Sequence, residues 1–298
     1  MSVRQIITPR LLRAAVIAMT VIGSLPVAAA EIRAQGDMEA VLEGKIETGD
    51  FEKLWSFLFD GNFSRGIYLA SPGGDLAEAM KIGRLVRSLN LQTEVPGDYP
   101  SKFMENRMHI LKEPKVDYMC VSACFFVYIA GIKRSVDSPF GRALLGIHRP
   151  FLSDSDLQAA TSDEAIASAN RTRAIVEIYL KEMGVPAKYA DEMFAISKDN
   201  IRWISPDEVR ADFNGFIPEL RDWVNARCDK RSDTEKNIWE QLMHGKTINE
   251  LTPTERAMVE TLAEKRREQF SCEDKLQSEL AGHAYQHALE LQDQSHSR

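Results

Sequence analysis

Residues 66–89 read GIYLASPGGDLAEAMKIGRLVRSL, and the local structure that they predict changes halfway along. The first six residues are a short run rich in strand formers, and it ends at a proline and two glycines. From Asp75 onward, apolar residues recur at helical spacing and share one face: Leu76, Ala79, Met80, Ile82, Gly83, Leu85 and Val86. A strand, a glycine turn and a helix make half of a βαβ unit, so the stretch predicts an α/β fold.

The flanking segments continue this alternation. LQTEVP (91–96) and GRALLGIHRP (141–150) predict further strands, and the polar, proline-containing stretch 97–117 predicts a surface excursion that is either a lid, a substrate-selecting loop or of no functional consequence. Helical patterns follow at 153–183, at 187–196 and at 205–213, the last opened by Ser205 as N-cap and Pro206 at the first helical position.

Beyond about residue 217 the sequence holds amphipathic, charged helical patterns without a strand between them. We therefore expect a core at 31–216 and an α-helical C-terminal appendage at 217–298.

The first thirty residues have the pattern of a signal peptide. Three arginines precede an uncharged run from Ala14 to Ala30, which ends in the small residues of a signal-peptidase site. Cleavage after Ala30 would change the formal net charge from −7 to −10, because it removes three arginines and no acid. We expect an exported, periplasmic protein with no membrane span after cleavage, and such an acidic chain is a poor partner for nucleic acid.

Four cysteines in an exported chain are an even set that oxidising conditions tend to pair. The pairing that we favour joins Cys228 to Cys272, which lie in two predicted helices. Cys120 and Cys124 are then either a second pair, if the chain brings their Cα atoms within about 7 Å, or buried thiols.

Ser122 stands in CVSACFF (120–126), directly before the apolar run ACFFVYIAG, which predicts a buried helix. Its ordinary interpretation is an N-cap, because serine is among the preferred residues there. A serine at a helix N-terminus is also a candidate nucleophile, with the N–H of Ala123 free to stabilise a developing negative charge. The two glycines of SPGGD can add a second such N–H, from Gly74.

His148 ends the apolar strand expected at 141–150, where it is either structural or a group presented for catalysis. Other candidates are weaker. His283 and His287, four apart on a helix, lack an acidic or cysteine partner for a metal, so we expect no metal and no cofactor. Nothing beside Cys124 indicates a reactive thiol. Lys133 in principle suits a Ser–Lys dyad, but its place a full helix after Ser122 favours a surface charge.

Four motifs, taken together, resemble the Clp protease catalytic subunit within the crotonase-like superfamily. They are SPGGD, the serine–alanine pair that opens an apolar helix ending in AGIKR, IHRP, and DNIRWISPDEV. The similarity covers roughly residues 31–218 and is greatest to the exported bacterial branch. It implies a repeated ββα core, a peptide or protein substrate and the possibility of a homo-oligomer.

The resemblance also implies roles for single residues. Ser122 would be the nucleophile, His148 the general base, and the N–H groups of Gly74 and Ala123 the oxyanion hole. The family's acid lies two residues before an aromatic, which is Trp203 here, and that position holds Ile201. Asp199 is our choice for the third member, with Asn200 as the alternative.

The sequence thus predicts an exported serine hydrolase, specifically a peptidase, that forms an acyl-enzyme on Ser122. The alternative is a catalytically inactive member of the family that binds a peptide or an envelope partner. The absence of an acid at position 201 is in keeping with this alternative. An acyl-CoA enzyme is a further alternative, which export disfavours because CoA thioesters are cytoplasmic.

Overall fold

The computed structural model describes residues 30–35, 38–96, 119–137, 145–150, 158–197, 199–230, 232–243 and 247–296. The expected signal peptide, apart from Ala30, lies outside the described residues. So do the excursion expected at 97–117 and the first four residues of the strand expected at 141–150.

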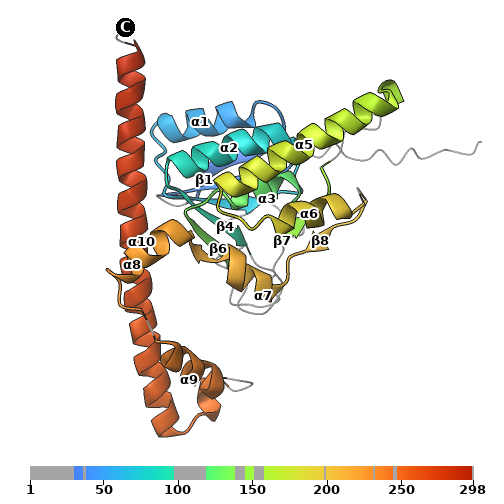
Figure 1. Cartoon of the computed structure of the whole chain (residues 1–298). Coiled ribbons are helices and arrows are strands. Elements are labelled where there is room, and N and C mark those ends of the chain that lie inside the picture. Colours follow the sequence, from blue (N-terminus) through green and yellow to red (C-terminus); the bar gives the residue numbers. More distant parts are fainter. Residues whose placement is uncertain are drawn as a thin grey trace, which may run out of the picture.

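The main sheet confirms the α/β prediction (Figure 1). Its six strands stand in the order β1 (Glu31–Gln35), β2 (Glu39–Glu43), β3 (Gly66–Ala70), β4 (Gln92–Pro96), β6 (Lys133–Asp137) and β9 (Gly215–Phe216). The four central strands are parallel, and β1 and β9 pair antiparallel at the two edges. A mostly parallel sheet needs helical crossovers, and helices here connect its strands.

A small second sheet carries the motif residues. It consists of β5 (Cys120–Val121), β7 (Leu145–Ile147) and β8 (Arg202–Trp203), with β5 parallel and β8 antiparallel to β7. Ser71, the residue after β3, forms a parallel bridge to Cys120. The carboxyl end of β3 and the start of β5 are therefore adjacent.

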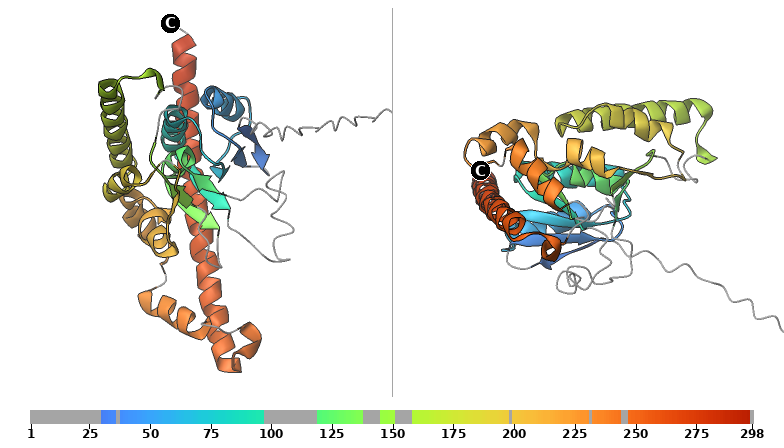
Figure 2. Two further views of the ribbon diagram at one scale, coloured as in Figure 1. Left: turned by 90° about the vertical axis from the view of Figure 1, so that its right-hand side faces the viewer. Right: turned by 90° about the horizontal axis from the view of Figure 1, so that it is seen from below.

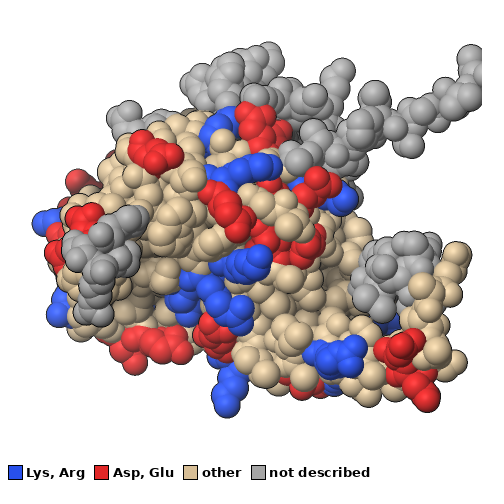
Figure 3. Space-filling model, turned by 90° about the horizontal axis from the view of Figure 1, so that it is seen from above, with Lys and Arg blue, Asp and Glu red and all other residues tan. Residues whose placement is uncertain are grey.

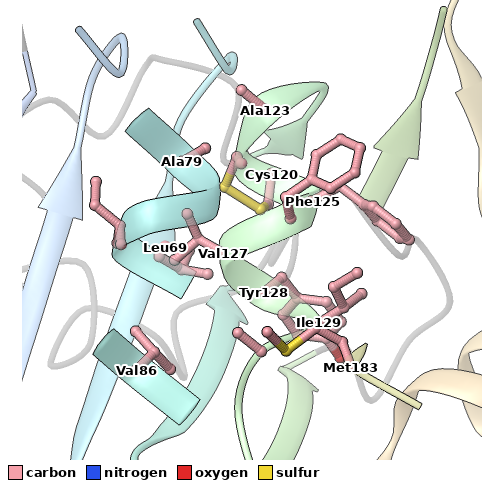
Figure 4. Close-up of a cluster of buried hydrophobic side chains, with 14 of the residues drawn as sticks. Leu69, Ala79, Val86, Cys120, Ala123, Phe125, Val127, Tyr128, Ile129 and Met183 are labelled. Carbon is pink, nitrogen blue, oxygen red and sulfur yellow. A yellow bond between two sulfur atoms is a disulfide. The ribbon is translucent and has the colours of Figure 1, made fainter. Parts of the chain in front are cut away.

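Helices α1 (Asp50–Phe59), α2 (Leu76–Ser88) and α3 (Ala123–Tyr128) cover the sheets. Helix α2 has the expected bounds within one residue, and the Asp75 side chain caps it by accepting from the N–H of Glu78. All six residues of α3 are buried. Figure 4 shows side chains of β3, α2 and α3 meeting in one cluster, among them Leu69, Ala79 and Val127. The apolar run after Ser122 is thus a central core helix.

Helices α5 (Ser162–Glu182) and α6 (Lys188–Ala195) agree with two of the expected helical patterns, although 151–157 lies outside the described residues. The helix expected at 205–213 is wrong as a single helix. A short α7 (Pro206–Glu208), with the expected Ser205 cap, passes into a π-helix, η3 (Val209–Phe213). The wider turn lets both Val209 and Phe213 reach the core, and the Phe213 carbonyl accepts the buried Tyr128 hydroxyl at 2.7 Å.

The C-terminal region is helical, as expected, with α8 (Pro218–Asn225), α9 (Asp233–Met243), a short 3-10 turn η4 (Ile248–Glu250) and the 44-residue α10 (Pro253–His296). Figures 1 and 2 show α10 as a rod that passes alongside the core. Its Gln277 donates to the carbonyls of Arg65 and Asn90, and Tyr285 stacks on Phe59 at 5.2 Å. The second half of α10 is therefore attached to the core.

Within the part of the chain that the structure describes, no helix is both long and apolar enough to cross a membrane. The face drawn in Figure 3 carries basic and acidic side chains in close alternation.

Candidate active site

The corner between β5 and α3 puts Ser122 in a conformation that serine rarely adopts. Its φ is 60° and its ψ is −122°. Among the described non-glycine residues only Asn90 shares a positive φ, and asparagine tolerates that region better than serine does. The corner is fixed by two hydrogen bonds, from the Ser122 N–H to the Gly146 carbonyl and from the Phe125 N–H to the Ser122 carbonyl, both at 3.1 Å. Outliers of this kind cluster at functional sites.

A second serine at a helix start shows how unusual Ser122 is. Ser205 precedes α7 with φ −69° and ψ 155°, and its hydroxyl accepts from the N–H of Glu208, as an N-cap does. Ser122 precedes α3, but its side chain makes no capping hydrogen bond to that helix. The N-cap interpretation therefore describes the position of Ser122 and not the role of its hydroxyl.

The glycine turn after β3 lies directly against this corner. Gly73 has φ 95°, and a Cβ built on it would stand 2.6 Å from the Cβ of Ser122 and 2.9 Å from the amide nitrogen of Ala123. Gly74 has φ 143°, and its N–H donates to no residue that the structure describes. The Ala123 N–H begins α3 and so lacks a partner within the helix. The structure thus brings the expected oxyanion donors into the neighbourhood of Ser122.

His148 follows β7 and lies at the same edge of the second sheet as Ser122. The parallel register pairs Cys120 with Leu145 and Val121 with Gly146, so the residues after β5 lie beside those after β7. The His148 ring is half-buried, and its Nδ1 lies 2.9 Å from the Arg149 carbonyl oxygen. A carbonyl oxygen only accepts, so Nδ1 is the donor in this contact.

The position that the resemblance assigns to the third triad residue, an acid, holds Ile201. In the antiparallel register of β8, Gly146 pairs with Trp203 and Ile147 with Arg202, and one further step sets Ile201 opposite His148. The Ile201 side chain lies over Gly146, with its Cγ2 2.8 Å from where a Cβ on that glycine would stand. Asp199 and Asn200 precede it in an exposed turn, in which the Asn200 N–H donates to Ser197.

The Arg149 carbonyl is the feature of this site that sequence reasoning missed. It lies against Nδ1 of His148, the ring nitrogen that an acid contacts in a Ser–His–Asp triad. Every residue has a carbonyl, so no pattern of residue types marks this one.

Arg202, the first residue of β8, is held by two carboxylates. Its guanidinium lies 2.5 Å from Glu208 and 3.1 Å from Glu192. Burial acts to raise the pKa of Glu208, but hydrogen bonds from Arg202 and from Ser205 outweigh it and lower that pKa to about 2. These contacts anchor the strand that faces His148.

Lys133 is not the surface charge that the sequence suggested. It is 8 % exposed, and its Nζ lies 3.9 Å from Glu273 and 4.6 Å from the ring centre of Phe270, both on α10. It begins β6, at the amino end of the parallel strands, whereas Ser122 follows the carboxyl end of β5. Strands of five residues separate those ends by about 16 Å, which is too far for a Ser–Lys dyad.

Both cysteine pairs are bonded. Cys228 is joined to Cys272, as expected, and Cys120 is joined to Cys124 with their Cα atoms 5.2 Å apart. The corner brings these two cysteines close enough for a disulfide, so Cys120 and Cys124 are a second pair and not buried thiols. Cys124 also has no thiol to act as a nucleophile.

His283 and His287 lie on α10, where both side chains are exposed. In the described ranges, no group of three or more His, Cys, Asp and Glu side chains is placed to hold a metal ion.

Comparison with known proteins gives structural similarities alone. No protein-family model matches, and no curated protein matches. Solved structures similar to the chain include the 1510-N membrane-bound stomatin-specific protease in a serine-to-alanine variant, with 19 % identity over 65 % of this chain and 86 % of that one and a TM-score of 0.39. A lysine-to-alanine variant of the same protease, in complex with a substrate peptide, is 16 % identical over 55 % of this chain and 64 % of that one, with a TM-score of 0.34.

An enoyl-CoA hydratase from Thermoplasma volcanium is 11 % identical over 83 % of this chain and 96 % of that one, with a TM-score of 0.34. With TM-scores below 0.5, these similarities carry no argument about the site.

Proposed function

We propose that the protein is a serine hydrolase, and specifically a peptidase, that forms an acyl-enzyme on Ser122. The observation that carries the proposal is the backbone of Ser122, with φ 60° and ψ −122° at a strand-to-helix corner. The sharp strand-to-helix turn of hydrolases exposes a nucleophilic hydroxyl in this way. A capping serine needs no such conformation, as Ser205 demonstrates.

In the first half of the reaction, Nε2 of His148 takes the proton of the Ser122 hydroxyl as Oγ attacks the substrate carbonyl carbon. The N–H groups of Gly74 and Ala123 stabilise the negative charge that develops on the carbonyl oxygen. The proton then passes from His148 to the departing amine, and the peptide bond breaks. A water molecule repeats the sequence on the ester, releasing the acid and restoring Ser122.

The buried side of the corner supports this chemistry. Ala123 and the five residues that follow it in α3 are buried, so one wall of the site is apolar. Hydrogen bonds to a developing charge are stronger where water is excluded.

Two further features support action outside the cytoplasm, in the periplasm. The first thirty residues have the pattern of a signal peptide, and both disulfides require an oxidising compartment to persist.

The test is a burst experiment with a p-nitrophenyl ester of a short acyl chain. An acyl-enzyme mechanism predicts a rapid release of nitrophenol equal to the enzyme concentration, followed by slow turnover. Ser122→Ala should abolish the burst, and Ser205→Ala, which removes a capping serine, should leave it intact. A burst that survives in Ser122→Ala would contradict the proposal.

A second candidate function has one observation in its favour. Ile201, which carries no charge, occupies the position opposite His148, where the resemblance places an acid. A member that binds a peptide or an envelope partner without cleaving it would need no acid at that position. Titration of Ser122→Ala and wild type with the same peptide library separates the two: equal binding without cleavage by wild type favours the binding protein.

A further inference from the structure

Ser122 lies at the centre of a very small covalent ring. Cys120 in β5 and Cys124 in α3 are joined by a disulfide, and both side chains are fully buried. Figure 4 shows this bridge inside the core, beside the side chains of α2 and α3. The five residues from Cys120 to Cys124 therefore form a closed loop, and the strained serine is its middle residue.

The corner has an obvious relaxed alternative. Serine before a helix normally has extended φ and ψ, with its hydroxyl accepting from an N–H of the first turn, as Ser205 does. In that state the Ser122 hydroxyl would face the helix and no longer the space beside Gly74. A positive φ is usually unfavourable for serine. That penalty alone would make the relaxed state about five to a hundred times more populated than the observed one.

The bridge opposes that relaxation. Cys120 is held between strands, since Val121 donates to Ser71 at 3.1 Å and Cys120 itself pairs with Leu145. An extended path over four residues spans about 13 Å, whereas the disulfide keeps the Cα atoms of Cys120 and Cys124 5.2 Å apart. With one end fixed in a sheet and the other in a buried helix, the residues between them are confined to a tight corner.

We propose that the Cys120–Cys124 disulfide is the positioning element that holds Ser122 in its reactive conformation, so that the reactivity of Ser122 depends on this bridge being closed. The proposal rests on the proposed function, because it concerns the nucleophile of that reaction. It extends that function by making the activity sensitive to the redox state of one particular bond.

The second disulfide is a matched control within the same chain. Cys228 and Cys272 join the segment after α8 to α10, with a sequence separation of 44 compared with 4 for Cys120 and Cys124. Closing a longer loop stabilises a fold more. The Cys228–Cys272 bridge should therefore contribute more to the melting temperature and nothing to the conformation of Ser122.

The experiment compares the rate of fluorophosphonate labelling at Ser122 in wild type, C120A/C124A and C228A/C272A, with circular dichroism and melting curves to confirm folding. We expect labelling to fall about tenfold or more in C120A/C124A, with the pH dependence of the remaining rate unchanged because His148 is intact. In C228A/C272A we expect the larger loss of melting temperature and a labelling rate within about twofold of wild type. Wild type reduced under native conditions should lose labelling and regain it on reoxidation.

If C120A/C124A does not fold, the labelling rates of wild type before reduction, after reduction and after reoxidation test the proposal instead. Equal labelling of C120A/C124A and wild type, or faster labelling after reduction, would overturn the proposal and leave the proposed function standing. If wild type is not labelled at all, the proposed function fails, and a crystal structure of C120A/C124A still tests the inference. A negative φ at Ser122 in that structure supports it, and a φ that stays near 60° without the bridge overturns it.

Discussion

Gly73 and Ser122 are packed so closely that the glycine has no room for a side chain. A Cβ on Gly73 would stand 2.6 Å from the Cβ of Ser122 and 2.7 Å from the carbonyl oxygen of Val121. The turn after β3 and the corner after β5 therefore fit together only because residue 73 is glycine.

Gly73→Ala should displace the corner and lower the labelling of Ser122 at least tenfold, with a loss of stability of about 2 to 4 kcal/mol from crowding and the positive φ together. Gly61→Ala is the control, because Gly61 has nearly the same φ, 99°, and open space around it. It should cost about 1 kcal/mol and leave labelling unchanged. Equal effects of the two substitutions on labelling would show that crowding at the corner is unimportant.

Replacing Ile201 by aspartate should supply the charge that the position opposite His148 lacks. Ile201 is 43 % exposed, so the fold should tolerate the change. We expect Ile201→Asp to raise the labelling rate of Ser122 by about tenfold, because a carboxylate stabilises the imidazolium that forms during attack. Ile201→Asn has the same shape without the charge and should gain far less. A rate that is the same in both variants and in wild type would contradict the placement of Ile201 beside His148.

Glu208 should contribute stability that depends on pH in a defined direction. Its pKa is lowered from the usual 4.5 to about 2 in the folded protein. As the pH falls, the Glu208 carboxylate is therefore protonated at a higher pH in the unfolded chain than in the folded protein. The contribution is therefore complete above about pH 4.5 and is lost as the pH drops toward 2.

We expect Glu208→Gln to lower the free energy of unfolding by about 1 to 2 kcal/mol at pH 7 and by progressively less below pH 4.5, as measured by urea denaturation. Asp207→Asn removes a neighbouring carboxylate that is 88 % exposed and should have little effect. A loss in Glu208→Gln that stays constant from pH 7 to pH 3 would show that the Arg202 and Ser205 contacts are not the cause.

Tyr285 should be the main anchor of the distal half of α10 on the core. Its ring stacks on Phe59 and contacts Phe63, and its hydroxyl donates to the Leu58 carbonyl at 3.1 Å. Tyr285→Ala should cost about 2 to 3 kcal/mol in urea denaturation. His287→Ala, at an exposed position half a turn away on the same helix, should change stability by less than about 0.5 kcal/mol. Equal stabilities of the two variants would mean that α10 is not held through Tyr285.

The parts of the fold that sequence reasoning predicted are those with a local signal. The strand, turn and helix of residues 66–89 are confirmed because alternation, glycine and helical spacing agree there. The expected Cys228–Cys272 pair and the Ser205 cap are likewise confirmed.

The parts that sequence reasoning missed depend on partners that are distant along the chain. Lys133 is buried because α10, some 140 residues later, brings Glu273 and Phe270 over it. The π-helix follows from the packing of Phe213 against Phe125 and Tyr189. At the site, by contrast, the resemblance already placed Ile201 at the position of the family's acid, and the register of β8 sets it opposite His148. The assignments of Ser122, His148, Gly74, Ala123 and Asp199 to catalytic roles remain predictions.

The central claim is that Ser122 is an activated nucleophile. The most direct measurement treats the folded, oxidised protein with a fluorophosphonate and locates the adduct by peptide mass spectrometry, beside Ser122→Ala and His148→Ala. The account predicts one adduct, on Ser122, that is absent from Ser122→Ala and formed at least a hundredfold more slowly in His148→Ala. Folded wild-type protein that acquires no adduct, or that acquires one equally well without His148, would contradict it.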